Sequence, residues 1–132
     1  MPRKPSTQPN DLELEILRVL WSKGPSSVRD VHEALEHSRD AGYSSTAKMI
    51  QIMCDKGLVR RGPSQRPQLF EPAAPEEQTQ TQILRHLIHK VFGGSARKLV
   101  LRAVQSEPLA ANEVAEIRKL LNQLLGEKRG RS

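Results

Sequence analysis

The side chains of this chain that could do chemistry are mainly basic, and they gather in one segment. Between residues 44 and 70, five basic residues stand against one acidic residue, whereas residues 11–43 hold four basic and seven acidic residues. The five basic residues are Lys48, Lys56, Arg60, Arg61 and Arg66. Lysine and arginine side chains bind phosphate oxygens, so this asymmetry predicts an oriented face for a polyanion such as nucleic acid.

Other kinds of chemistry find little support in the sequence. It holds no nucleophile elbow and no phosphate-binding glycine-rich loop, so we expect no enzyme and no cofactor. His86 and His89 are three residues apart and could share a metal ion, but no further ligands are evident and surface histidines are the favoured interpretation, so we expect no metal. Cys54 is the single cysteine, which we interpret as a buried structural thiol, with a redox sensor as the alternative.

The bulk composition describes a small basic protein. The 132 residues carry a formal net charge of +6, and only 3% of them are aromatic, so any core must be small and mostly aliphatic. No apolar run approaches the roughly 18–20 residues that cross a membrane. The first ten residues are not followed by an apolar stretch typical of a secretory signal, so we expect a cytoplasmic protein.

The first half of the chain predicts three helices and a hairpin. Apolar spacing and capping residues favour helices over about residues 11–23, 28–36 and 44–56, with Ser44 or Ser45 capping the third and Gly57 ending it. Two short strands at 58–61 and 68–71 flank a Gly/Pro/Ser loop. This order is typical of a winged helix-turn-helix domain, here residues 10–73, preceded by a flexible arm over residues 1–9.

In this fold the third helix is expected in the major groove and the hairpin, about residues 58–71, on the DNA backbone as the wing. Lys48 is expected to contact a phosphate or a guanine edge. Met49 and Ile52 either meet thymine methyl groups or, if the helix is rotated, belong to the core. The full set of expected DNA contacts is Ser44, Ser45, Thr46, Lys48, Met49, Ile52, Arg60, Arg61 and Arg66.

The second half predicts three amphipathic helices, over about residues 75–92, 95–108 and 110–125, followed by a frayed tail at 127–132. Three helices of this size bury too little apolar area by themselves to offset the entropy lost on folding. We therefore interpret residues 74–126 as a dimerisation domain, with folding back onto the head as the alternative. The expected dimer contacts are Leu84, Leu87, Ile88, Val91, Leu99, Val114, Ile117, Leu120, Leu121 and Leu124. The fold class is therefore mainly α with one small β-hairpin.

Several stretches resemble one family of regulators. They are LEILRVLW at 14–21, VRDV at 28–31, YSST at 43–46, MCDKGLVRR at 53–61, FGGS at 92–95 and EVAEIRKLL at 113–121. In this order they are similar to the penicillinase-repressor family, the BlaI/MecI/CopY group of winged-helix regulators. The resemblance implies a homodimeric repressor on a short inverted repeat of DNA. It also implies control of β-lactam or other stress-response genes, and a sensor or protease that relieves repression.

Two departures from the family pattern bear on how repression would end. Relatives that respond to β-lactams are cleaved at an Asn-Phe bond, where this chain has Arg102 and Ala103 as the candidate cleavage region. Copper-responsive relatives carry paired cysteines near the C-terminus, and this chain ends without them. Two alternative functions stay open at this point: a sequence-tolerant nucleoid-type DNA-binding protein, and a winged helix that binds only protein.

Overall fold

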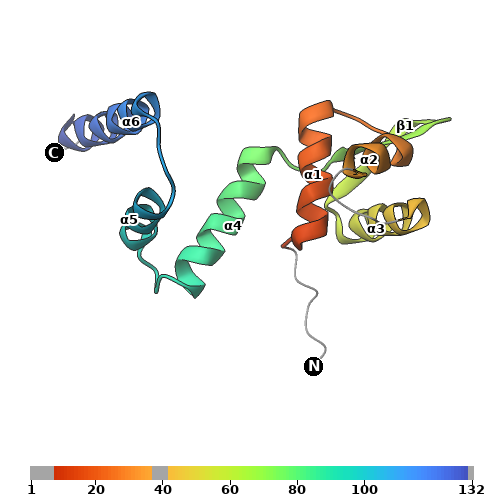
Figure 1. The fold of residues 1–132 in the computed structure, drawn as a ribbon, viewed down its shortest axis with the longest axis horizontal. Coiled ribbons are helices and arrows are strands. Elements are labelled where there is room, and N and C mark those ends of the chain that lie inside the picture. Colours follow the sequence, from red (N-terminus) through yellow and green to blue (C-terminus); the bar gives the residue numbers. More distant parts are fainter. Residues whose placement is uncertain (1–7, 37–41, 131–132) are drawn as a thin grey trace. The chain divides into compact units, whose positions relative to one another are not determined.

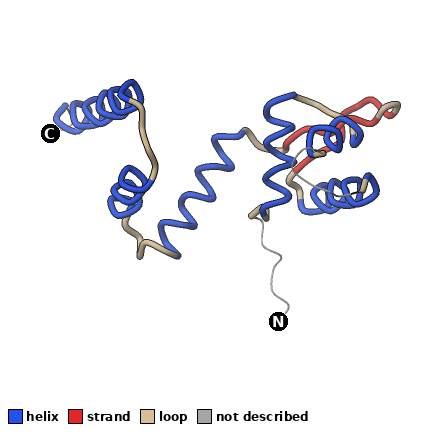
Figure 2. The backbone as a smooth tube through the Cα atoms, in the orientation of Figure 1, coloured by secondary structure: helices blue, strands red, loops and turns tan. Residues whose placement is uncertain are grey.

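The computed structural model describes residues 8–36 and 42–130. Over these residues the chain forms six helices and one hairpin (Figures 1 and 2). The elements are α1 (Asp11–Lys23), α2 (Val28–Leu35), α3 (Tyr43–Lys56), β1 (Val59–Gln65), β2 (Gln68–Pro72), α4 (Glu76–Lys90), α5 (Ala96–Ser106) and α6 (Ala111–Gly130). Most of the arm expected at 1–9 and the last two residues of the expected tail lie outside the described residues.

A single aliphatic core holds the head, by which we mean the elements from α1 to β2. Three helices and both strands contribute to it, and Figure 1 shows the helices gathered beside the hairpin. Its buried members are Ile16, Leu17, Leu20, Val31, Leu35, Ile50, Met53, Val59 and Phe70. Burying such a side chain contributes about 1.5–3 kcal/mol, so these few residues supply most of the driving force for folding the head. The apolar spacing of all three helices predicted this inward face.

Local capping sets the ends of the first two helices. The Asn10 side chain accepts from the Glu13 N–H at 2.9 Å, and the Glu13 carboxylate accepts from the Asn10 N–H at 2.9 Å. Ser27 and Asp30 form the same reciprocal pair at the start of α2. Each pair satisfies two backbone donors that a helix N-terminus leaves unpaired, so both helices begin where the sequence predicted.

The prediction that Ser44 or Ser45 caps α3 is wrong. The helix begins at Tyr43 with Gly42 as its N-cap, and no side chain makes a cap hydrogen bond. The Gly42 carbonyl accepts from the N–H groups of Ser45 at 3.1 Å and Thr46 at 3.2 Å, so both serines lie inside the first turn. The predicted end of the helix is confirmed, since Gly57 adopts the left-handed conformation at φ 79° that glycine tolerates best.

The hairpin is longer than the sequence predicted and is tied to the helix-turn-helix. β1 and β2 pair antiparallel, with Arg60 opposite Glu71 and Arg61 opposite Phe70. The strands continue to Gln65 and Gln68, because the Gly62-Pro63 stretch is accommodated in a register irregularity and the turn falls at Arg66-Pro67. Phe70 also exchanges two backbone hydrogen bonds with Ser26, which joins the hairpin to the α1–α2 connection.

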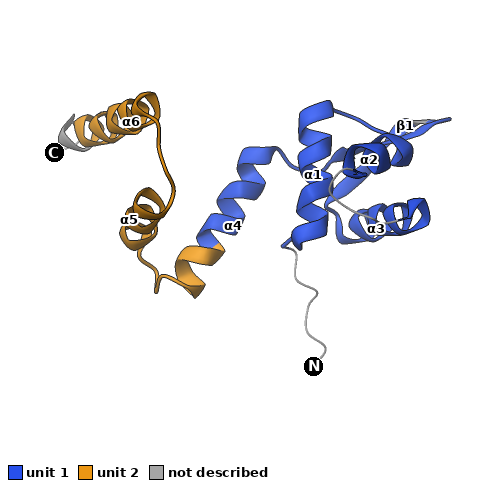
Figure 3. Ribbon diagram, in the orientation of Figure 1, with its two compact units in different colours: residues 1–85 blue, residues 86–132 orange. Residues whose placement is uncertain are grey.

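The compact unit that contains the head extends past residue 73, where the sequence placed the end of the winged helix-turn-helix domain. The Trp21 indole N–H donates to the Ala74 carbonyl at 3.1 Å, and the Ala73 N–H donates to the Leu58 carbonyl at 3.0 Å. Thr79 in the first turn of α4 is buried. The chain accordingly divides into two compact units, residues 1–85 and 86–132, with the start of α4 in the first (Figure 3).

The remaining helices are well formed locally but bury little. The Ser95 side chain caps α5, as its place in the sequence allowed, by accepting from the Lys98 N–H at 3.1 Å. α6 continues to Gly130 instead of fraying from residue 127, because Glu127 and the basic residues after it are good helix formers and one interior glycine costs only about 1 kcal/mol. No described helix is long and apolar enough to cross a membrane.

Candidate nucleic-acid interface

The outer face of α3 carries a basic and polar surface. Ser44, Ser45 and Lys48 are exposed. The Lys48 ammonium makes no ion pair or hydrogen bond with any described residue, so none of these residues would compete with an anion for its charge. The two serines lie in the first turn, where backbone N–H groups and the helix dipole favour a phosphate. These three residues are therefore exposed, as a contact with DNA requires, and the contact itself stays a prediction.

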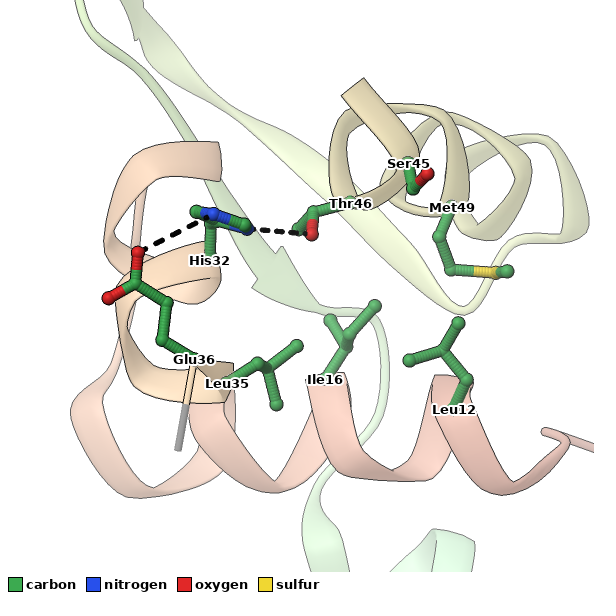
Figure 4. Close-up of a pocket in the computed structure, with 8 residues that line it drawn as sticks. All are labelled: Leu12, Ile16, His32, Leu35, Glu36, Ser45, Thr46 and Met49. Atoms are coloured by element: carbon green, nitrogen blue, oxygen red, sulfur yellow. Dashed lines mark hydrogen bonds and ion pairs between the residues drawn. The ribbon is translucent and has the colours of Figure 1, made fainter. Parts of the chain in front are cut away.

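Thr46 was expected to face DNA, but the structure turns it inward. Its side chain is buried, and its hydroxyl lies 3.1 Å from Nδ1 of His32 on α2 (Figure 4). Nε2 of the same imidazole lies 3.6 Å from the Glu36 carboxylate, and the ring meets Tyr43 edge-on with ring centroids 5.7 Å apart. Thr46 thus joins the two helices of the helix-turn-helix, because in a regular helix it shares the inner face with Ile50 and Met53.

Met49 and Ile52 take different positions. Met49 packs against the core and, with Leu12 and Ile16 from α1, lines a small cavity that Figure 4 shows beneath the start of α3. For this residue the structure supports the core alternative that the sequence left open. Ile52 is half-buried and does not belong to the core cluster, so part of its side chain faces outward. A thymine-methyl contact therefore stays a prediction for Ile52 and loses its support for Met49.

The three arginines of the wing differ in how they are engaged. Nε of Arg60 lies 2.7 Å from the Glu71 carboxylate on the opposite strand. Arg61 donates to the Gln51 side chain of α3, and its guanidinium lies 6.0 Å from the centre of the Phe70 ring. Arg66 is exposed at the turn and makes no such contact with a described residue. Of the three arginines, Arg66 is thus the one without a partner among the described residues, and Arg61 connects the wing to α3.

One ion pair escaped the sequence analysis. Lys56 belongs to the basic segment in which the sequence predicted a face for a polyanion, but its ammonium lies 3.0 Å and 3.2 Å from the two carboxylate oxygens of Glu13. Glu13 is completely buried, although a glutamate in the first turn of a helix by itself indicates only a favourable interaction with the helix dipole. The two residues are 43 positions apart. The one available signal was a glutamate inside the apolar stripe of α1, next to Leu12 and three residues before Ile16.

Two side chains have shifted pKa values. Hydrogen bonds from the backbone and then the side chain of Ser27 hold the pKa of Asp30 below its ordinary 3.8, which keeps the α2 cap ionised. Burial raises the pKa of the Cys54 thiol, and nearby Arg61 offsets only part of that effect. Cys54 is half-buried against the core, so its thiol stays protonated at neutral pH. This supports a structural role over a reactive one.

The residues expected to dimerise are largely uncovered in the single chain. Exposed members include Val91, 64% exposed, and Ile117, 37% exposed, whereas Ile88 and Leu99 are half-buried. The other exposed members are Leu84, Leu87, Val114, Leu120, Leu121 and Leu124. Among the described residues after Thr79, no side chain is buried.

The remaining candidate residues of the second half lie on helix surfaces. His86 and His89 are exposed on α4, and the described residues contain no group of three side chains that could hold a metal ion. Arg102 and Ala103 are both exposed within α5. A protease would therefore meet these two residues in a regular helix.

Comparison with known proteins agrees with this arrangement. A family model described as penicillinase repressor matches residues 10–123. Methicillin resistance regulatory protein MecI of Mammaliicoccus sciuri is 25% identical over 111 residues, covering 84% of this chain and 90% of that protein. Transcriptional regulator BlaI of Mycobacterium tuberculosis is 27% identical over 119 residues, covering 89% and 86% respectively. The penicillinase repressor of Staphylococcus aureus is 20% identical over 112 residues, covering 85% and 89%. The chain therefore belongs to the penicillinase-repressor family, whose members are transcriptional repressors and not enzymes.

Proposed function

We propose that this protein is a homodimeric repressor that binds a short inverted repeat of double-stranded DNA. The observation that carries the proposal is that two exposed cations, neither with a partner among the described residues, lie on the two elements that meet DNA in this fold: Lys48 on α3 and Arg66 on the hairpin turn. α3 would enter the major groove with Ser44, Ser45 and Lys48 near its start. The hairpin would follow the backbone, with Arg66 at a phosphate or in the minor groove.

The dimer is inferred from the apolar side chains that the single chain leaves exposed. Large apolar groups on α4, α5 and α6 would together form an extensive exposed apolar surface, which a soluble monomer rarely keeps. Pairing two copies removes that surface from water at about 25 cal/mol per Å². A two-fold axis would also present two copies of α3 to successive turns of the duplex, roughly 34–36 Å apart.

The genes under control are inferred from the relatives. Their names refer to methicillin resistance and to penicillinase, so we propose resistance or other stress-response genes as targets. Because a repressor acts on DNA, we expect the protein in the cytoplasm. Repression would end through a sensor or a protease, for which the exposed Arg102-Ala103 stretch of α5 is the candidate cleavage region.

Genome-wide capture of DNA bound to the full chain tests the proposal directly. We expect a few short sites, each an inverted repeat beside a promoter, and footprinting should show protection of both half-sites. Broad coverage without a common sequence would instead indicate a nucleoid-type binder. Absence of bound DNA would leave the protein-binding winged helix as the function.

A further inference from the structure

Among the described residues of the head, Glu13 carries the one fully buried carboxylate. It is 0% exposed and accepts from the Asn10 N–H at 2.9 Å and from the Lys56 ammonium at 3.0 Å and 3.2 Å. The Lys56 side chain is 30% exposed, so the pair is partly shielded from water. A buried carboxylate is unfavourable unless such partners compensate for its lost hydration, so its geometry is tightly fixed by them.

This ion pair lies at the far end of the recognition helix. Lys56 is the last residue of α3, and it precedes Gly57 and the start of β1. At the other end of α3, the Thr46 hydroxyl is held by His32. The two contacts are ten residues apart, which is about 15 Å along a helix at 1.5 Å per residue. Together they tie the N-terminal part of α3 to α2 and its C-terminal end to α1.

We infer that Glu13 is a positioning residue for sequence recognition: through Lys56 it fixes the angle at which α3 projects from the head. The inference rests on the proposed function, since it concerns how α3 meets a specific site. An apolar pair of similar size would stabilise the head as well as an ion pair does, because burying charges loses hydration. The ion pair differs from an apolar pair because its hydrogen bonds are directional, so they hold the two side chains in one geometry.

Two variants of the full chain separate positioning from a direct role of Lys56. Glu13→Gln keeps an oxygen for the Asn10 N–H but removes the charge that holds Lys56. We expect the ratio of affinities for the strongest captured duplex over a shuffled duplex to fall about tenfold, the loss of roughly one base contact. Lys56→Met should lower the ratio similarly, with the salt dependence of binding unchanged. Glu33→Gln, an exposed carboxylate on α2, is the control and should leave the ratio unchanged.

A direct phosphate contact by Lys56 gives the opposite pattern and would overturn the inference. Glu13→Gln would then free Lys56 and strengthen binding to every duplex. Lys56→Met would weaken binding to every duplex and lower the salt slope by about one unit for each head. If Lys56 touches DNA, the two single variants therefore change DNA affinity in opposite directions. If Glu13 acts through Lys56, both variants lower the affinity ratio.

An apolar replacement of the pair tests whether it does more than stabilise. In the double variant Glu13→Leu with Lys56→Met, water can reach the exposed Asn10. We expect Tm to return to near the wild-type value while the affinity ratio stays low. Recovery of both would show that the pair only stabilises. If the Tm of the double variant is well below that of wild type, the affinity ratio of Glu13→Gln is measured instead, at a temperature well below the Tm of that variant. An unchanged ratio then overturns the inference. If the wild-type protein itself binds no duplex better than a shuffled one, that result instead contradicts the proposed function.

Discussion

Arginine side chains in the wing have the same charge but different availability. Glu71 pairs with Arg60, and Gln51 and the Phe70 ring hold Arg61, whereas Arg66 at the turn has no partner in the described part of the chain. A phosphate would have to compete with Glu71 for Arg60. Arg61 would have to give up its contact with α3 to bind a phosphate. Arg66 gives up no such contact on binding, so it should supply most of the electrostatic attraction of the wing.

Arg66→Ala should therefore weaken binding to all duplexes alike. We expect the slope of log affinity against log salt to become shallower by about one unit for each wing on the duplex. Arg60→Ala is the matched comparison and should change the slope less, because Glu71 already neutralises that charge. Titrations at several salt concentrations measure both slopes. An Arg66→Ala slope equal to the wild-type slope would exclude the wing as a phosphate clamp.

Thr46 makes a different prediction, because it faces His32 and not the DNA. Thr46→Val keeps the shape of the side chain but removes the hydroxyl, leaving His32 Nδ1 without that partner. We expect a loss of about 1 kcal/mol in the free energy of unfolding, measured by urea denaturation. The salt dependence of DNA binding should not change. A shallower slope without loss of stability would mean that Thr46 reaches the backbone as first predicted from the sequence.

The sequence predicted the type of each residue at the interface better than its direction. Lys48 and Arg66 are exposed, as the sequence predicted, because an isolated charge in a small domain has only the surface to go to, and their contacts with DNA stay predictions. Thr46 was misplaced because it was grouped with the two exposed serines before it, although it lies four and seven residues before Ile50 and Met53 and so shares their buried face. Met49 was left open because it lies at the border between that face and the outer one.

At the scale of elements, most helix ends that depend on neighbours in the sequence were predictable, although the start of α3 at Gly42 was not. The caps at Asn10 and Ser27 and the stop at Gly57 all involve residues within four positions of each other. The Glu13–Lys56 pair was not predictable, because each partner has an ordinary local role at a helix end. Only the packing of α1 against α3 brings them together.

The Ser27–Asp30 cap gives a pH-dependent prediction for α2, a helix of only eight residues. The folded-state pKa of Asp30 lies below its ordinary 3.8, so its contribution to stability is present above that value and is lost as pH falls through the lowered pKa. Asp30→Asn should therefore be less stable than wild type by a constant amount above about pH 5, and the difference should shrink in acid. Urea titrations from pH 3 to 7 measure it.

Ser27→Ala tests the other half of the same cap. The substitution removes the oxygen that accepts from the Asp30 N–H, and we expect a loss of about 1 kcal/mol at neutral pH. Ser27→Asn is the control, since asparagine also caps helices well. Equal stability of the alanine and asparagine variants would mean that Phe70 and Ser26, and not the cap, hold the start of α2.

At the scale of the whole molecule, the second half has too little buried surface to account for its own helices. Short helices are marginal in water without packing, yet α5 and α6 bury no described side chain in the single chain. The apolar spacing of α4 to α6 predicted this need for a partner surface. It could not identify the partner, because leucine stripes fit a second copy and a neighbouring domain equally well.

Leu121→Glu should separate a dimer from a self-contained monomer. Leu121 is exposed on the apolar stripe of α6, so the charge would be harmless in a monomer but would be buried and unpaired in a dimer. We expect sedimentation to show monomers, with Tm of the head unchanged. Affinity for the inverted repeat should fall by about 10²–10⁴, since the two heads lose their shared effective concentration.

Gln123→Glu adds the same charge on the polar face of α6 and should leave the dimer and its affinity intact. The affinity of both variants for a single half-site should equal that of wild type, because one head is enough to bind it. A Leu121→Glu protein that still sediments as a dimer would exclude the α6 stripe from the interface. A wild-type protein that is monomeric at micromolar concentration, yet protects both half-sites, would instead require that DNA itself brings the two copies together.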